Sequence, residues 1–121
     1  MIVRSLKDIE GSENDWRWSA GLTRRLLLER DGMGFTVTDT TVEAGTSSPL
    51  HYRDHLEACY CIEGRGEVEC DGVVHAIAPG TIYALDRHDA HVLRAHTDMR
   101  LICVFNPALE GGEKPGRPGE W

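Results

Sequence analysis

The sequence predicts an all-β domain, either a small antiparallel β-barrel or a sandwich, on three observations. Short runs of alternating apolar and polar residues recur along most of the chain. Turn signals built from Gly, Asn, Asp and Pro separate them at intervals of about 8 to 12 residues, as in sandwiches and barrels. The 121 residues suffice for one domain with a single core and are too few for two. We therefore expect one domain over residues 1–121, with residues 107–121 as a C-terminal arm.

The N-terminal third is predicted to hold two strands and a loop before a longer strand. Met1–Lys7 is expected to be the first strand, and Asn14–Gly21 a loop anchored by two tryptophans. Thr23–Gly32 fits a short helix or a strand, and the Asp31-Gly32 dipeptide, typical of hairpin turns, favours the strand. Met33–Gly45 alternates threonines with large apolar residues, which predicts a half-buried strand.

The rest of the chain is predicted as further strands joined by turns. His51–Gly72 contains two short strands joined by the turn Glu63–Gly66, and the second strand turns back as a hairpin at Asp71-Gly72. Gly80–His96 is a strand, a turn and another strand, and Met99–Pro107 is a further strand. The tail is rich in Gly and Pro, which predicts an arm or loop.

Composition narrows the classes of partner. The formal net charge is -7 and the pI about 5.3, which argues against nucleic acid or an anionic membrane as a partner, because both favour basic patches. No apolar run reaches the ~18 residues of a membrane span. The N-terminus lacks the long apolar stretch of a signal peptide, so we expect a cytoplasmic protein.

One strand carries an ionisable group on its inward face. Glu57 and Cys59 share a face with Cys61, and Cys103 is in phase with Phe105 on a later strand. If this face lines the interior, the cavity holds a carboxylate, thiols and neighbouring threonines, and a buried carboxylate needs a partner. The cysteines are expected to be free thiols, with a thiolate metal site as the alternative.

Two cupin motifs are partly present. Glu57 and Gly64 fit the end of the first, Glu-x6-Gly, and Pro79-Gly80 nearly fits the second. The histidines that cupins usually place in these motifs correspond here to Leu50, Tyr52 and Tyr83, so three of the four usual ligands are missing. Four blocks resemble one cupin family, ectoine synthase, almost without gaps from Arg24 to Pro107: RRLLLERDGMGF, HYRDHLEACYCIEGRGEVE, PGTIYALDRHDAHVLRA and TDMRLICVFNP.

This resemblance implies a cupin-type, jelly-roll-like barrel and a metal-dependent hydro-lyase. The enzyme would close N-γ-acetyl-L-2,4-diaminobutyrate to ectoine, a compatible solute that protects against osmotic stress, with loss of water. It implies Fe(II), one per chain, held by Glu57, Tyr83 and His91, and a homodimer. Tyr83 and His91 flank the turn at residues 84–90, so a hairpin is expected to bring both to one rim of the barrel. Candidate catalytic residues are Tyr52 and His55. The positions that the family uses to bind substrate correspond to Arg25, Thr40, Tyr52, His55, Cys103, Phe105 and Glu113. From the sequence alone, Arg25 is expected either to hold a carboxylate with two hydrogen bonds or to be a surface arginine.

Three positions depart from the family pattern. Thr38 stands where the family has Asn, Gly21 where it has Trp, and Pro115 where it has His; Trp18 is a possible substitute for the missing tryptophan. Two other readings therefore stay open. One is a diverged enzyme of the same fold acting on a related amino-acid derivative, and the other is a metal-free cupin that only binds a small molecule, with Glu57 hydrogen-bonded to Tyr83.

Overall fold

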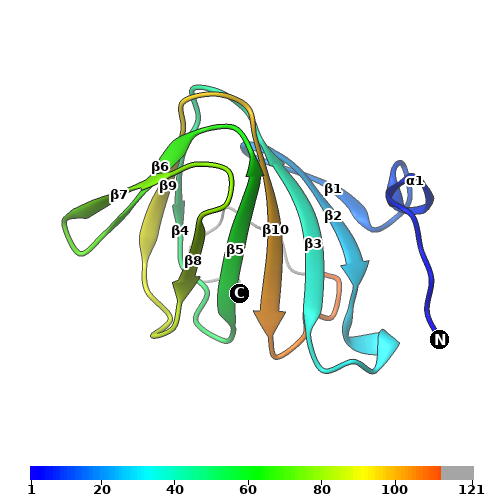
Figure 1. Cartoon of the computed structure of the whole chain (residues 1–121). Coiled ribbons are helices and arrows are strands. Elements are labelled where there is room, and N and C mark those ends of the chain that lie inside the picture. The colour runs from blue at the N-terminus through cyan, green and yellow to red at the C-terminus, as the bar shows by residue number, and fades with distance from the viewer. Residues whose placement is uncertain (113–121) are drawn as a thin grey trace.

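The computed structural model describes residues 1–112 and shows two facing antiparallel sheets (Figure 1). One has six strands in the order β1-β2-β3-β10-β5-β8, and the other has four in the order β4-β9-β6-β7. The strands are β1 (Asp15–Trp18), β2 (Gly21–Leu27), β3 (Thr36–Val42), β4 (Ser47–Leu50), β5 (Leu56–Glu63), β6 (Gly66–Cys70), β7 (Val73–Ile77), β8 (Ile82–Leu85), β9 (His91–Ala95) and β10 (Met99–Asn106). Two short helices, α1 (Leu6–Ile9) and the 3-10 helix η1 (Glu29–Asp31), complete the described part.

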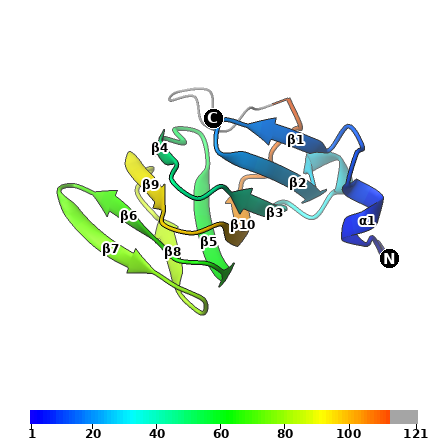
Figure 2. The same cartoon turned by 90° about the horizontal axis from the view of Figure 1, so that it is seen from above.

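The all-β prediction is confirmed, and the barrel is open. Within residues 1–112 no strand of one sheet pairs with a strand of the other, so the core is the layer between two sheets. The β6–β7 hairpin projects at one side and α1 lies at the opposite side (Figures 1 and 2). No helix in this part of the chain is long and apolar enough to span a membrane.

Alternation determines which side chains form the core. On β5 the residues Glu57, Cys59 and Cys61 are buried, whereas Tyr60 is 44% exposed on the other face. On β3 the inward face is made by threonines, because Thr36 and Thr38 are fully buried and Val37 is only half-buried. The hairpin predicted at Asp71-Gly72 is also confirmed. Both of its turn residues have positive φ, 52° and 76°, the backbone of a type I′ turn.

The prediction for the N-terminal part is wrong in three places. Met1–Lys7 is not a strand; the chain instead enters α1, where the Ser5 amide donates to the Asp8 carboxylate at 2.8 Å. The expected loop at Asn14–Gly21 contains β1, which pairs with β2. The strand expected to run to Asp31-Gly32 ends at Leu27, because η1 follows it. The alternation of polar residues and tryptophans in β1 spans only four residues, too few to identify a strand from the sequence, and its pairing depends on the neighbouring strand.

The start of the predicted C-terminal arm belongs to the core. Leu109 has no exposed surface, its amide donates to Thr36 Oγ1 at 2.8 Å, and its carbonyl accepts from the Glu29 amide at 2.8 Å. Residues 107–112 therefore pack against β3 and the start of η1. Glu113 and Pro115 lie outside the described residues.

Candidate active site

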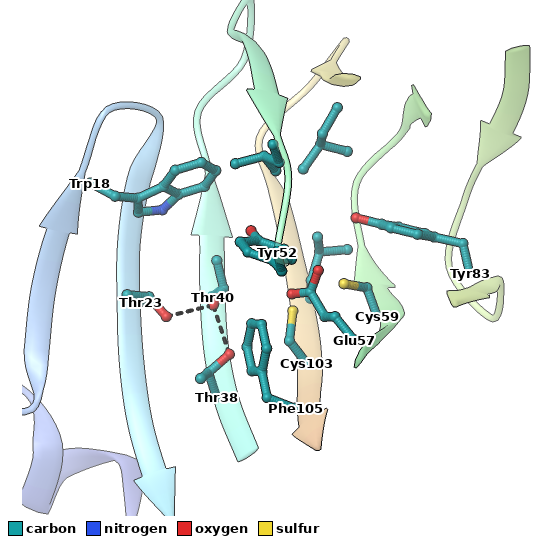
Figure 3. Close-up of a pocket in the computed structure, with 13 residues that line it drawn as sticks. Trp18, Thr23, Thr38, Thr40, Tyr52, Glu57, Cys59, Tyr83, Cys103 and Phe105 are labelled. Carbon is teal, nitrogen blue, oxygen red and sulfur yellow. Dashed lines mark hydrogen bonds between the residues drawn. The ribbon is translucent and has the colours of Figure 1, made fainter. Parts of the chain in front are cut away.

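A small cavity between the sheets gathers polar groups from both halves of the six-stranded sheet (Figure 3). Its free volume is about 30 Å³, room for about two water molecules, so a substrate can enter only when side chains move. The lining residues are Trp18, Thr23, Thr38, Thr40, Leu50, Tyr52, Glu57, Cys59, Tyr83, Leu93, Leu101, Cys103 and Phe105.

Strand register explains why these groups meet. Cys103 on β10 lies opposite Thr38 on one side and Cys59 on the other, and Cys59 lies opposite Tyr83 on β8. The next inward row brings Glu57 opposite Phe105. A row of polar side chains thus crosses β3, β10, β5 and β8 on the inward face.

Glu57 is a buried carboxyl group with a strongly altered acidity. Burial raises its pKa from the ordinary 4.5 to about 8, although hydrogen bonds from the thiols of Cys59 and Cys103 oppose the rise. Both thiols are buried and free, as is Cys61, which confirms the inward-facing cysteines expected from alternation. The carboxylate would be favoured by a cation at this position.

His91 is oriented as a metal ligand would be. Its Nδ1 lies 2.9 Å from the Asp89 carbonyl oxygen, which fixes the tautomer with the proton on Nδ1. Its Nε2 is buried and has no hydrogen-bond partner among residues 1–112. Burial also lowers the pKa of the imidazole, so the ring is neutral and presents a lone pair.

Tyr83 is near both of the other predicted ligands. It lines the same cavity as Glu57, and Figure 3 shows its hydroxyl directed toward Cys59 and Glu57. Its ring contacts the His91 ring edge-on, with centroids 6.3 Å apart. His91 itself does not line the cavity, but its ring is also edge-on to that of Tyr52, with centroids 6.0 Å apart. The hairpin predicted to bring Tyr83 and His91 together is wrong, because β8 and β9 belong to opposite sheets.

A buried carboxylate, a phenol and a neutral imidazole with a free Nε2 fit a divalent transition metal. A second set of donor atoms also lies close together: single donor atoms of Glu57, Cys59 and Cys103 are within 4.8 Å of one another. Both sets share Glu57, which makes it the central residue of either site. The hydrogen bond from Tyr83 to Glu57 that a metal-free cupin would use is not among the side-chain hydrogen bonds of residues 1–112. Burial raises the pKa of Tyr83 well above its ordinary value, so without a cation the phenol keeps its proton.

Comparison with known proteins shows the family to which the chain belongs. The family model described as ectoine synthase matches residues 1–121. The chain is 50% identical to L-ectoine synthase from Desulfatibacillum aliphaticivorans, covering 100% of this chain and 96% of that protein. It is 53% identical to L-ectoine synthase from Halalkalibacterium halodurans, covering 93% and 89%. The chain belongs to the ectoine synthase family.

Solved structures agree with this assignment. The crystal structure of ectoine synthase from P. lautus superposes with a TM-score of 0.89 at 49% identity, covering 92% of this chain and 81% of that one. A cupin 2 conserved barrel domain protein from Salinispora arenicola superposes with a TM-score of 0.69 at 21% identity, covering 87% of each chain, which supports the fold alone. The chain thus has a cupin-type fold, and its place in the ectoine synthase family makes it an enzyme of the hydro-lyase type.

Only some of the predicted substrate-binding residues of this ectoine synthase family member line the cavity. Thr40, Tyr52, Cys103 and Phe105 line the cavity. His55 is buried behind them, with Nδ1 2.7 Å from the Pro107 carbonyl oxygen and its ring edge-on to Phe105. Glu113 cannot be placed, because it lies outside the described residues.

Arg25 is not a surface arginine, although the sequence alone left that reading open. It is 1% exposed, lies 4.8 Å from the Trp16 ring centroid and donates from Nη1 to the Gly111 carbonyl at 2.9 Å. It is not among the cavity-lining residues of the described part. Arg25 therefore joins the C-terminal segment to the six-stranded sheet.

The cavity wall contains one polar residue that the sequence did not indicate. Thr23 was not singled out, although it is in phase with Arg25 on one strand and lies opposite Thr40 in the sheet. Trp18, the expected substitute for the missing tryptophan, is 7% exposed and lies in the cavity wall. A side chain at Gly21 would overlap the Thr41 carbonyl, so the local backbone leaves no room for the family's tryptophan there. Trp18, directly opposite Gly21 in β1, brings an indole to the cavity instead.

Proposed function

We propose that this chain converts N-γ-acetyl-L-2,4-diaminobutyrate to ectoine and water. About 50% identity to L-ectoine synthases over nearly the whole chain supports this activity. The observation that carries the proposal within the molecule is the buried Glu57, which lines the cavity together with Tyr83, whose ring contacts the imidazole of His91. The enzyme would act in the cytoplasm, where the product protects against osmotic stress.

Glu57, Tyr83 and His91 are the residues that would hold Fe(II). A bound divalent metal supplies Lewis-acid polarisation of an oxygen atom, which an amide needs because it is a poor electrophile. The protein prepares each ligand separately. Asp89 orients His91 through its backbone carbonyl, the inward phase of β5 directs Glu57 into the cavity, and β8 presents Tyr83 from the edge of the sheet.

The reaction joins the amine nitrogen to the amide carbon and breaks the bond from that carbon to oxygen. The oxygen leaves as water with two hydrogens lost from nitrogen. A narrow cavity folds the substrate so that amine and carbonyl meet, which contributes much of the rate through proximity. Exclusion of bulk water favours dehydration over amide hydrolysis.

Tyr52 is the proposed proton donor to the leaving oxygen. It lines the cavity, and burial first, followed by the nearby Glu57, raises its pKa, so the phenol keeps its proton at neutral pH. His55 does not line the cavity, and its Nδ1 is held by the Pro107 carbonyl. We therefore assign His55 to positioning Phe105 rather than to proton transfer.

The activity is tested by incubating iron-loaded protein with N-γ-acetyl-L-2,4-diaminobutyrate and separating the products by chromatography. We expect ectoine as the product. If no ectoine forms and a related diaminobutyrate or glutamine derivative is converted, the chain is a diverged enzyme of the same fold. If the protein binds the substrate without converting any of these compounds, the enzymatic proposal fails.

We also propose a homodimer that buries the outer face of the six-stranded sheet. Register aligns Ile102, Tyr60 and Ile82 in one row across β10, β5 and β8, and Tyr60 and Ile82 are 44% and 62% exposed. Val104, 38% exposed, begins the next row. A contiguous apolar patch of this kind is typical of a surface that another protein covers.

Light scattering tests this surface. Tyr60→Glu should give a monomer, because it places a charge in the centre of the apolar patch, whereas Val73→Glu on the projecting hairpin should leave the dimer intact. A wild-type monomer, or dimers in both variants, would reject this interface.

A further inference from the structure

The cavity has two chemically different walls. On one side lie Glu57, Cys59, Cys103 and Tyr83, which include two of the proposed metal ligands. On the other lie Trp18, Thr23, Thr38 and Thr40 from β1, β2 and β3, here called the donor wall (Figure 3). The donor wall contains no ionisable side chain, and its four residues are all at most 8% exposed.

The three hydroxyl groups of the donor wall form a continuous chain. Thr40 Oγ1 lies 2.9 Å from Thr23 Oγ1 and 2.9 Å from Thr38 Oγ1. Each hydroxyl carries one hydrogen, and the two bonds use two of the three hydrogens. One hydroxyl hydrogen therefore remains, whichever way the chain is oriented.

A second hydrogen-bond donor, an indole N–H, lies in the same wall as these hydroxyl groups. Trp18 Nε1 is buried and has no hydrogen-bond partner among residues 1–112. The indole N–H can only donate, and buried donors are rarely left unpaired in proteins. Figure 3 shows the indole nitrogen on the side of the ring that faces Thr23.

We propose that the donor wall binds the carboxylate of the substrate, and that Thr23 and Thr38 are positioning residues for the Thr40 hydroxyl. This inference rests on the proposed function for the identity of the substrate. A carboxylate only accepts hydrogen bonds, and its two oxygens match one indole and one hydroxyl donor. Arg25, the residue expected to bind the carboxylate, donates instead to Gly111 and does not line the cavity within residues 1–112.

The arrangement assigns a purpose to two departures from the family pattern. Thr38 supplies the hydroxyl at one end of the hydrogen-bonded threonines, and its strand register places it between Arg25 and Cys103. Trp18 supplies its indole from β1, since Gly21 has no space for a side chain. The substrate amide would then extend from the donor wall toward Glu57 and Tyr83 on the other wall.

Calorimetric titration of the substrate into protein stripped of metal tests the donor wall without turnover. Trp18→Phe keeps the aromatic ring and removes the donor, and Thr23→Val removes one end of the hydroxyl chain. We expect each to weaken binding about 10-fold or more, the range for one hydrogen bond to a charged group. In the iron-loaded protein the same variants should raise KM and leave kcat nearly unchanged, because the lost contact is remote from the reacting carbon.

Two control variants separate this role from a structural one. Thr23→Ser keeps the hydroxyl, so its affinity for the substrate should stay within about twofold of wild type. Thr41→Val removes a hydroxyl outside the donor wall, and its affinity should also stay within about twofold of wild type. Thr41 neighbours Thr40 but faces the other side of the sheet, where its hydroxyl accepts from the Leu22 amide at 3.0 Å. Equal affinity in wild type, Trp18→Phe and Thr23→Val would overturn the inference, as would a wild-type protein that does not bind the substrate. Ectoine formation, measured separately, decides the proposed function, so the two failures are distinguishable.

Discussion

At pH 8, metal-free Glu57→Gln protein should be more stable to heat than metal-free wild type, although it should make no ectoine. Burial raises the pKa of Glu57 from 4.5 to about 8, so the folded protein holds this proton over a pH range in which the unfolded chain has lost it. The stability of the wild type therefore falls as pH rises from about 4.5 to about 8. Glutamine has no proton to lose, so the variant escapes this penalty.

The expected difference in free energy of unfolding between Glu57→Gln and wild type is large. Each pH unit between the two pKa values corresponds to about 1.4 kcal/mol, giving a difference of several kcal/mol at pH 8 and almost none at pH 4.5. In melting temperature this is roughly 15 to 20 °C for a chain of this size. Thermal unfolding at pH 5 and pH 8 measures it, with Glu63→Gln, an exposed position on the same strand, as the control. A difference between Glu57→Gln and wild type that stays constant over this pH range would contradict the buried-carboxyl account.

His91→Asn should lose nearly all bound iron and, with it, ectoine formation. The imidazole presents a buried Nε2 without a protein partner, and Asp89 already fixes its tautomer. Removing a ligand should lower metal affinity by more than the roughly 10- to 100-fold seen for outer-shell partners. Tyr83→Phe keeps the ring and should have the same direction of effect.

His96→Asn is the matched control for this experiment. His96 is exposed, and its Nε2 lies 3.2 Å from Glu67 Oε1 on the four-stranded sheet. Its loss should leave iron content and activity unchanged. Full iron occupancy in both His91→Asn and Tyr83→Phe would reject these ligands and favour the alternative set of Glu57, Cys59 and Cys103.

The sequence predicted which side chains face inward more successfully than which strands pair. Alternation on β5 and β10 correctly placed Glu57, Cys59 and Cys103 on the buried face, because the side-chain period of a strand is local. Alternation does not report the sheet to which a strand belongs. The expected hairpin between Tyr83 and His91 is wrong for that reason, since the chain crosses from one sheet to the other between them.

Local signals also missed contacts made over long sequence distances. The four-residue strand β1 and the packing of Leu109 depend on partners that periodicity cannot identify. Thr23 belongs to the cavity only because register places it opposite Thr40. The metal ligands were expected from family resemblance rather than from spacing, and they remain predictions.

The central claim is that this buried centre, loaded with iron, makes ectoine. The most direct measurement is the rate of ectoine formation in samples of the wild-type protein whose iron content is varied and quantified. We predict a rate proportional to bound iron, reaching its maximum at about one iron per chain. Ectoine formation that is independent of iron content, or no ectoine from fully loaded protein, would contradict the account.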